Sequence, residues 1–134
     1  MSADAPKRSL EEPTAREGNP FPRAARLLKH ADFERVYKQG RRHFSSHMTV
    51  FYLRQTEGGA RTGFTVGRVL GGAVARNRIK RRLREAVRLR RALLSGPVDV
   101  VINPKKSVRT IEFSMVLDEV GRAFETIRKK MTEK

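Results

Sequence analysis

Residues 76–91 carry nine of the 30 Lys and Arg residues of the chain and a single acid, Glu85. Their net charge is nine minus one, or +8, which is half of the formal charge of +16 on the whole chain. Apolar residues recur through this run with the spacing of a helix, so one side must pack on a core while the charges stay outside. Like charges this dense repel one another without an anionic partner, and nucleic acid is the densest common polyanion. We therefore expect contact with nucleic acid.

The charges of this run are sorted by face on a helix that is predicted over residues 73–94. One stripe is apolar and comprises Ile79, Leu83, Ala86, Val87, Leu93 and Leu94. The adjoining face is polar and basic and comprises Asn77, Lys80, Arg81, Arg84, Arg88 and Arg91. Arg78 and Arg82 fall on a third side with Glu85. A helix face that is merely solvated usually mixes charges at positions i and i+4, whereas this face stacks like charges, which favours nucleic-acid binding.

Composition limits the rest of the chain to one modest domain. Residues 1–22 hold four of the six prolines and nearly balanced charges, which is typical of a disordered tail, so a single domain is expected over 23–134. The chain has no Cys and only three His, which disfavours disulfides and Cys- or His-rich metal sites. No apolar run approaches the roughly 20 residues that cross a bilayer, and the N-terminus lacks an apolar signal core. We expect a cytoplasmic protein without a membrane partner.

A short amphipathic helix is predicted near the start of the folded part. Phe33, Val36 and Tyr37 share one of its faces at the spacing i, i+3, i+4. Gly40 stands where a helix C-cap belongs, and His30 is a weak N-cap. Aromatic residues at i and i+4 pack in a core more often than they bind a ligand, so this pair is first of all a core signal.

Strands and a last helix complete the pattern. Alternating residues predict strands over 43–55, 61–66 and 98–102. Within the second of these, Gly63 and Thr65 put only small side chains on one face, and such a low face leaves room for a ligand or a closely packed backbone. The last helix is predicted to follow an N-cap at Thr110 and to bury a stripe of Phe113, Val116, Leu117, Val120, Phe124 and Ile127. The order helix, strands, helix, strand, helix indicates an α/β (α+β) fold with three helices and a small sheet of three to four strands.

A nuclease active site on the chain itself is not supported. His43 and His47 are the only close pair of histidines, and on a strand they would lie about 13 Å apart, too far to share a metal. Asp99 lies between valines without a second acid at a pairing distance in sequence. The glycines at 67, 71 and 72 are not followed by Lys-Ser/Thr, so a phosphate-binding loop is not indicated. We expect no catalytic and no metal-binding residue on this chain.

The sequence of residues 73–85, Ala-Val-Ala-Arg-Asn-Arg-Ile-Lys-Arg-Arg-Leu-Arg-Glu, resembles the Arg-Asn-Arg signature of the bacterial ribonuclease P protein component. The likeness covers roughly residues 27–104. It includes Leu-Lys at 28–29, Asp-Phe at 32–33, Val-Tyr at 36–37, Gly-Arg at 40–41, Gly-Phe-Thr-Val at 63–66 and Gly-Gly-Ala-Val at 71–74.

The resemblance implies a fold and a function. The fold is a two-layer sandwich with a left-handed strand-helix-strand crossover, against the strong general preference for right-handed ones. The function is that of a subunit of an endoribonuclease, in which a catalytic RNA subunit with Mg²⁺ removes the 5′ leader of precursor tRNA. The protein would assist by binding that RNA and the leader, and no protein partner is inferred.

The resemblance also implies two groups of site residues. Residues of the signature helix would bind the RNA subunit: Arg76, Asn77, Arg78, Lys80, Arg81, Arg84 and Arg88. Residues of the first helix, the sheet and the loop before the signature would bind the leader: Phe33, Tyr37, Phe51 and Arg68. Aromatic platforms beside positive charge are also what physical chemistry expects for a single strand.

One departure and one alternative remain. Where the family commonly has Ser-Lys-Lys, an apolar residue and Gly, this chain has Gly67, Arg68, Val69, Leu70 and Gly71, which puts a phosphate contact at position 69 in question. A small ribosomal or nucleoid protein would equally explain the charge and the missing catalytic set. It would not explain the first helix and the signature together.

Overall fold

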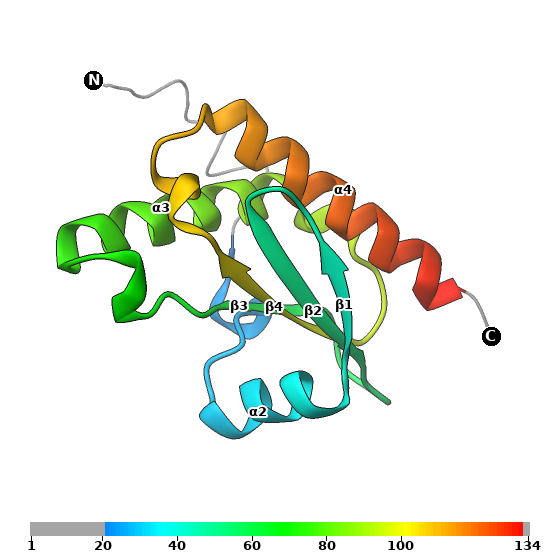
Figure 1. The fold of residues 1–134 in the computed structure, drawn as a ribbon. Coiled ribbons are helices and arrows are strands. Elements are labelled where there is room, and N and C mark those ends of the chain that lie inside the picture. Colours follow the sequence, from blue (N-terminus) through cyan, green and yellow to red (C-terminus); the bar gives the residue numbers. More distant parts are fainter. Residues whose placement is uncertain (1–20, 133–134) are drawn as a thin grey trace.

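The computed structural model describes residues 21–132. Within them, three helices and four strands follow one another with short 3₁₀ turns between them (Figure 1). The helices and strands are α2 (His30–Gln39), β1 (Arg41–Phe44), β2 (Met48–Arg54), β3 (Arg61–Phe64), α3 (Ala73–Arg90), β4 (Val98–Pro104) and α4 (Phe113–Thr132). The 3₁₀ turns are η2 (Arg23–Ala25), η3 (Arg68–Leu70), η4 (Arg91–Leu93) and η5 (Lys106–Arg109).

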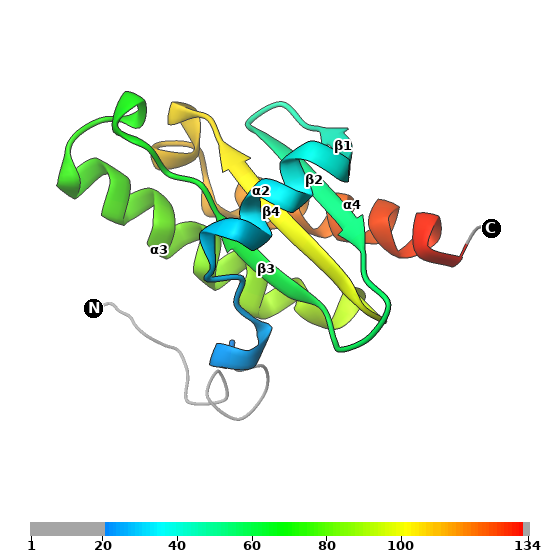
Figure 2. The same cartoon turned by 90° about the horizontal axis from the view of Figure 1, so that it is seen from below.

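The four strands form one mixed sheet in the order β1-β2-β4-β3. β1 and β4 both run antiparallel to β2, whereas β3 runs parallel to β4. The parallel pair is joined through α3. Seen from the α2 side with both strands pointing upward, β4 lies to the right of β3 and α3 passes behind the sheet, so the crossover is left-handed (Figure 2). The α+β fold with three helices and four strands agrees with the expectation.

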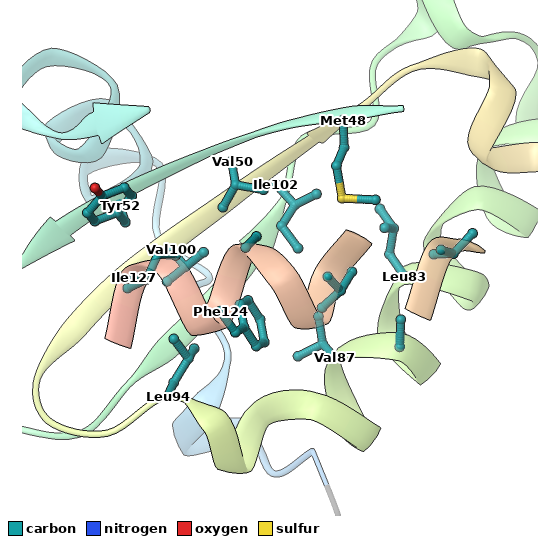
Figure 3. Close-up of a cluster of buried hydrophobic side chains, with 14 of the residues drawn as sticks. Met48, Val50, Tyr52, Leu83, Val87, Leu94, Val100, Ile102, Phe124 and Ile127 are labelled. Atoms are coloured by element: carbon teal, nitrogen blue, oxygen red, sulfur yellow. The ribbon is translucent and has the colours of Figure 1, made fainter. Parts of the chain in front are cut away.

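Helices cover both faces of the sheet. α3 and α4 lie on one face and α2 on the other, so α2 adds a third, partial layer to the expected two-layer sandwich (Figure 1). The cause is the strand β2, which is apolar on both faces: Val50 and Tyr52 face α3 and α4, while Phe51 and Leu53 face α2. The main core between sheet and helices includes Met48, Val50, Leu83, Val87, Val100, Ile102, Phe124 and Ile127 (Figure 3).

Several predicted boundaries shift. The strand predicted over 43–55 is a hairpin, in which Ser45 and Ser46 interrupt the apolar alternation and the Ser45 N–H donates to the Met48 carbonyl at 2.9 Å. The strand predicted to stop at 102 continues to Pro104, because Thr49 and Met48 of β2 still pair with its last residues.

The predicted helix caps also shift. α4 begins at Phe113 rather than after Thr110, because the Thr110 N–H donates to Ser107 and closes η5. His30 is not the N-cap of α2 but its first helical residue, where its ring lies 3.3 Å from the Glu34 carboxylate.

The folded part begins earlier than expected. Phe21 was assigned to the tail, yet only 7% of its surface is exposed, because it packs in the main core with its ring edge-on to Phe64. The Arg26 guanidinium covers the Phe21 ring and donates to the Phe21 carbonyl at 3.0 and 3.2 Å. The remaining tail, 1–20, lies outside the described residues. Between residues 21 and 132 no helix combines the length and the apolar character that a bilayer crossing requires.

Two glycines allow the close packing of α2 on the sheet. A Cβ at Gly40 would lie 2.5 Å from the Val36 carbonyl oxygen and 2.6 Å from that of Tyr52, so α2 can turn directly into β1 only with glycine there. A Cβ at Gly63 would lie 2.5 Å from Cζ of Phe33 and 2.9 Å from the Leu27 carbonyl oxygen. The low face expected on this strand therefore admits the backbone of Leu27 and the ring of Phe33.

Candidate nucleic-acid interface

The apolar stripe of α3 is buried as expected. Ile79, Leu83, Ala86 and Val87 are inaccessible to solvent and pack in the main core. α3 itself ends at Arg90, and η4 carries the chain on to Leu94, which is buried as well. Burial of this stripe fixes the rotation of α3, so the basic residues on its other sides have defined directions.

Two arginines on the third side of α3 serve the fold. The Arg82 guanidinium donates to the carbonyl oxygens of Val108 and Ile111 at 2.6 and 2.5 Å. Arg78 donates from Nε to the Arg109 carbonyl oxygen at 3.1 Å. Burial lowers the pKa of Arg82, and the neighbouring charge of Arg78 lowers it further. These two side chains hold the segment around η5 against α3, a role that helical periodicity could not reveal.

Four of the seven residues predicted to bind the RNA subunit are free on the surface of α3. Asn77, Arg81 and Arg84 are exposed and Lys80 is half-buried. None of them forms an ion pair or a hydrogen bond with another described residue. The other three are engaged within the protein: Arg76 donates from Nε to the Gly71 carbonyl at 3.1 Å, Arg78 to Arg109, and Arg88 to Glu85 at 3.0 Å.

The three aromatic residues predicted to bind the leader come together between α2 and the sheet. Phe33, Tyr37 and Phe51 are each half-buried and pack on a small second core of Leu27, Val36 and Val101. The rings of Tyr37 and Phe51 meet edge to face, with centroids 4.9 Å apart and planes at 85°. Each ring is thus part core and part surface.

The hydroxyl of Tyr37 is fixed by Asn103 of β4 and by Thr65, which follows β3. It donates to Oδ1 of Asn103 at 2.7 Å and shares a hydrogen bond with Oγ1 of Thr65. The ring therefore has one orientation, which a stacking platform for a base requires. Asn103 and Thr65 did not stand out in the sequence, because their partner is distant along the chain.

A pocket joins Phe33 of the aromatic cluster to the basic helix α3. Its volume is about 290 Å³, and Phe33 and Gly63 line it together with Lys80 and Arg84 of α3. The family resemblance implies a contact of Lys80 and Arg84 with the RNA subunit alone, whereas in the fold they also share a pocket with Phe33. Arg68 is exposed on η3 and does not line this pocket, and its neighbour Val69 is 80% exposed.

Two titratable residues flagged in the sequence, Asp99 and His47, have structural partners. Asp99 is fully buried and accepts hydrogen bonds from the Arg61 guanidinium at 2.9 and 2.7 Å. Donation of these hydrogen bonds to Asp99 raises the pKa of Arg61. His47 lies 2.7 Å from the Ser107 hydroxyl, and its backbone N–H donates to Glu119. Among residues 21–132, no three His, Asp or Glu side chains gather in a way that could hold a metal ion.

Comparison with known proteins identifies the family. A family model described as Ribonuclease P matches residues 21–128. The chain belongs to the ribonuclease P protein family. The ribonuclease P protein component of Desulforapulum autotrophicum is 38% identical over 107 residues, which cover 80% of this chain and 92% of that protein. The ribonuclease P protein component of Citrifermentans bemidjiense is 38% identical over 111 residues, which cover 82% and 94%.

Solved structures of ribonuclease P proteins share the fold. The RNase P protein of Staphylococcus aureus matches with a TM-score of 0.69 at 25% identity, over 79% of this chain and 97% of that protein. That of Thermotoga maritima matches with a TM-score of 0.68 at 25% identity, over 75% and 96%. The expectation of a protein subunit of ribonuclease P, the endoribonuclease of tRNA 5′ processing, is thereby confirmed over the ribosomal and nucleoid alternatives.

Proposed function

We propose that this ribonuclease P protein binds the catalytic RNA subunit with the exposed face of α3 and the 5′ leader of precursor tRNA in the aromatic cleft beside α2. The observation that carries the proposal is the pocket that Phe33 lines together with Lys80 and Arg84. Through it the basic face of α3 adjoins the aromatic cleft at Phe33. A leader bound on the rings would therefore pass beside the cations Lys80 and Arg84 before it reaches the RNA subunit.

The RNA-subunit side of this surface rests on charge without internal partners. Arg81 and Arg84 are exposed, and α3 is about 27 Å long, enough to follow several phosphates. Asn77 and Lys80 extend the same face. Arg76 and Arg78 form their hydrogen bonds within the protein through Nε, which leaves their terminal nitrogens for phosphates. Arg88 would give up its ion pair with Glu85 and bind a phosphate of the RNA instead.

The leader side rests on fixed aromatic rings near cations. Each base stacked on an aromatic side chain is worth about 1–3 kcal/mol, and Phe33, Tyr37 and Phe51 each keep part of their surface exposed. Arg68, exposed on η3, adds a cation for the leader or the tRNA backbone.

The chemistry lies on the RNA subunit in this proposal. The RNA would hold the Mg²⁺ ions that assist hydrolysis of the phosphodiester. The reaction would take place in the cytoplasm, and the protein would have no membrane partner. The protein contributes binding and orientation of the leader.

Reconstitution at low Mg²⁺ tests the division of labour. Precursor tRNA is incubated with the protein alone, with the RNA subunit alone and with both, and release of the leader is followed on a gel. We expect no cleavage by the protein alone and much faster cleavage by the pair than by RNA alone. Cleavage by the protein alone, or no gain from adding it, would contradict the proposal.

Removal of an aromatic platform is expected to weaken binding of the leader selectively. Phe33→Ala or Tyr37→Ala should lower the affinity of the holoenzyme for leader-bearing precursor about tenfold, because about one stacked base is lost, and should leave mature tRNA nearly unaffected. Equilibrium binding of both RNAs measures the difference. Leu53→Ala, on the same side of the sheet, removes packing without a ring and should affect both RNAs equally. If all three variants lose equal affinity for leader-bearing precursor and for mature tRNA, the cause is a folding defect instead.

A further inference from the structure

Arg42 lies at the outer end of the aromatic cleft. It is on β1, directly opposite Phe51 of β2, and neighbours in register share a face of the sheet. The guanidinium carbon of Arg42 is 5.5 Å from the centroid of the Phe51 ring. Arg42 is exposed and forms no ion pair with any other residue between 21 and 132. Its charge is therefore positioned by an aromatic face and not neutralised by an acid.

The contact with Phe51 prepares Arg42 to bind an anion. A cation over an aromatic face is worth about 0.5–1 kcal/mol at an exposed site, enough to restrict the side chain without consuming its N–H donors. The planar guanidinium keeps its donors in the fork that matches a phosphate. Arg42 is thus held beside the cleft with its hydrogen-bonding capacity intact.

The cleft crosses the sheet from β3 to β1. Phe33 lies on Gly63 of β3, Tyr37 bonds Asn103 of β4, and Phe51 is on β2. α2 runs across these strands and ends beside β1 (Figure 2). With neighbouring strands about 4.8 Å apart, the three steps from β3 to β1 span about 14 Å. Lys80 and Arg84 stand at the β3 end, and Arg42 stands at the β1 end.

We propose that Arg42 is a further RNA-binding residue, which holds a backbone phosphate of the leader at the end of the cleft remote from α3. This inference rests on the proposed function, since it takes the occupant of the cleft to be a single strand. The β3 end adjoins the face that binds the RNA subunit, so the nucleotides near the cleavage site lie there. Arg42 then meets nucleotides farther upstream in the leader, and its contribution depends on leader length.

A matched pair of arginines on one strand tests this role. Arg41 is the neighbour of Arg42 and is equally exposed, but it is in register with Tyr52 and lies on the opposite face of the sheet, in a separate pocket with Arg54 and Lys130. Arg41→Gln and Arg42→Gln remove the same charge from the same strand. The holoenzyme of each variant is titrated with precursor tRNAs that carry leaders of increasing length, at several salt concentrations.

Arg42→Gln is expected to weaken binding of long leaders about fivefold and to reduce the slope of log affinity against log salt by about 0.7, one single-strand phosphate. Leaders too short to reach β1 should bind normally, Arg41→Gln should bind all leaders normally, and Arg42→Lys should retain most of the affinity. A length-independent loss, or an equal loss for Arg41→Gln, would overturn the inference. If Tyr37→Ala loses leader affinity while Arg42→Gln does not, this inference fails and the proposed function stands. If neither substitution lowers the affinity for leader-bearing precursor more than the affinity for mature tRNA, the proposed function fails as well.

Discussion

Replacement of Arg61 by Met is expected to lower the free energy of unfolding by about 3–5 kcal/mol, because it leaves a buried carboxylate without its partner. Asp99 on the central strand β4 is fully buried, and its two oxygens accept their hydrogen bonds from the Arg61 guanidinium. Arg61 is itself about one-third exposed, so the loss arises from the stranded Asp99 and not from the arginine. Urea unfolding of the protein alone measures the change.

A double variant separates the charge from the packing. Arg61→Met with Asp99→Val removes both members of the pair, and a buried ion pair replaced by apolar residues is often nearly neutral. We therefore expect the double variant to recover most of the stability that Arg61→Met loses. Asp32→Asn should have a smaller effect than Arg61→Met, because Asp32 lies 3.5 Å from Arg61 and also pairs with Arg35. Additive losses from Arg61→Met and Asp99→Val would show that the two residues act independently.

Neutralising the free guanidinium groups of α3 is expected to weaken assembly with the RNA subunit about 10- to 100-fold. Arg81→Gln with Arg84→Gln would remove two of the proposed phosphate contacts, each worth about 1 kcal/mol or more. The slope of log affinity against log salt should fall by about one phosphate's worth for each residue. Filter binding or calorimetry of the protein with the RNA subunit over a range of salt concentrations measures both quantities.

Two exposed arginines of α4 provide the control. Arg122→Gln with Arg128→Gln makes the same change in net charge, and each removes only an exposed ion pair, with Asp118 or Glu125, worth about 0.3–0.5 kcal/mol. These variants should keep nearly all of the affinity. If both double variants lose affinity and salt dependence equally, the net charge of the protein and not the face of α3 determines RNA binding.

The periodicity of the apolar residues was sufficient to predict the three helices and the faces of α3. Ile79, Leu83 and Val87 follow a helical repeat that only a core can satisfy, so their burial could be predicted without any tertiary information. The β1–β2 hairpin could not, because Ser45 and Ser46 fit the edge of a long strand as well as a turn. The third layer could not be predicted, because it depends on the face of the sheet on which α2 packs before the chain enters β1, and no local pattern encodes that face.

The residue types of the site could be predicted from the sequence, but most of their arrangement in space could not. The cluster of Phe33, Tyr37 and Phe51 followed from the resemblance together with the alternation of β2. The partners of Arg78 and Arg82, and the pocket that Lys80 shares with Phe33, did not follow, because a helical wheel gives the direction of a side chain but not its neighbours. These arrangements bring together residues that are far apart in the sequence.

The order of strands across the sheet has a consequence for synthesis of the protein. Among residues 21–132, β4 is the last strand, yet it lies inside the sheet and is the one strand to which β3 pairs. A nascent chain that ends before residue 98 can form the local β1–β2 hairpin, but its β3 has no strand to join. Because α3 precedes β4 in the chain, the basic helix is synthesised before the sheet that orients it can be completed. The cleft beside α2 therefore closes only after the chain has been made to Pro104.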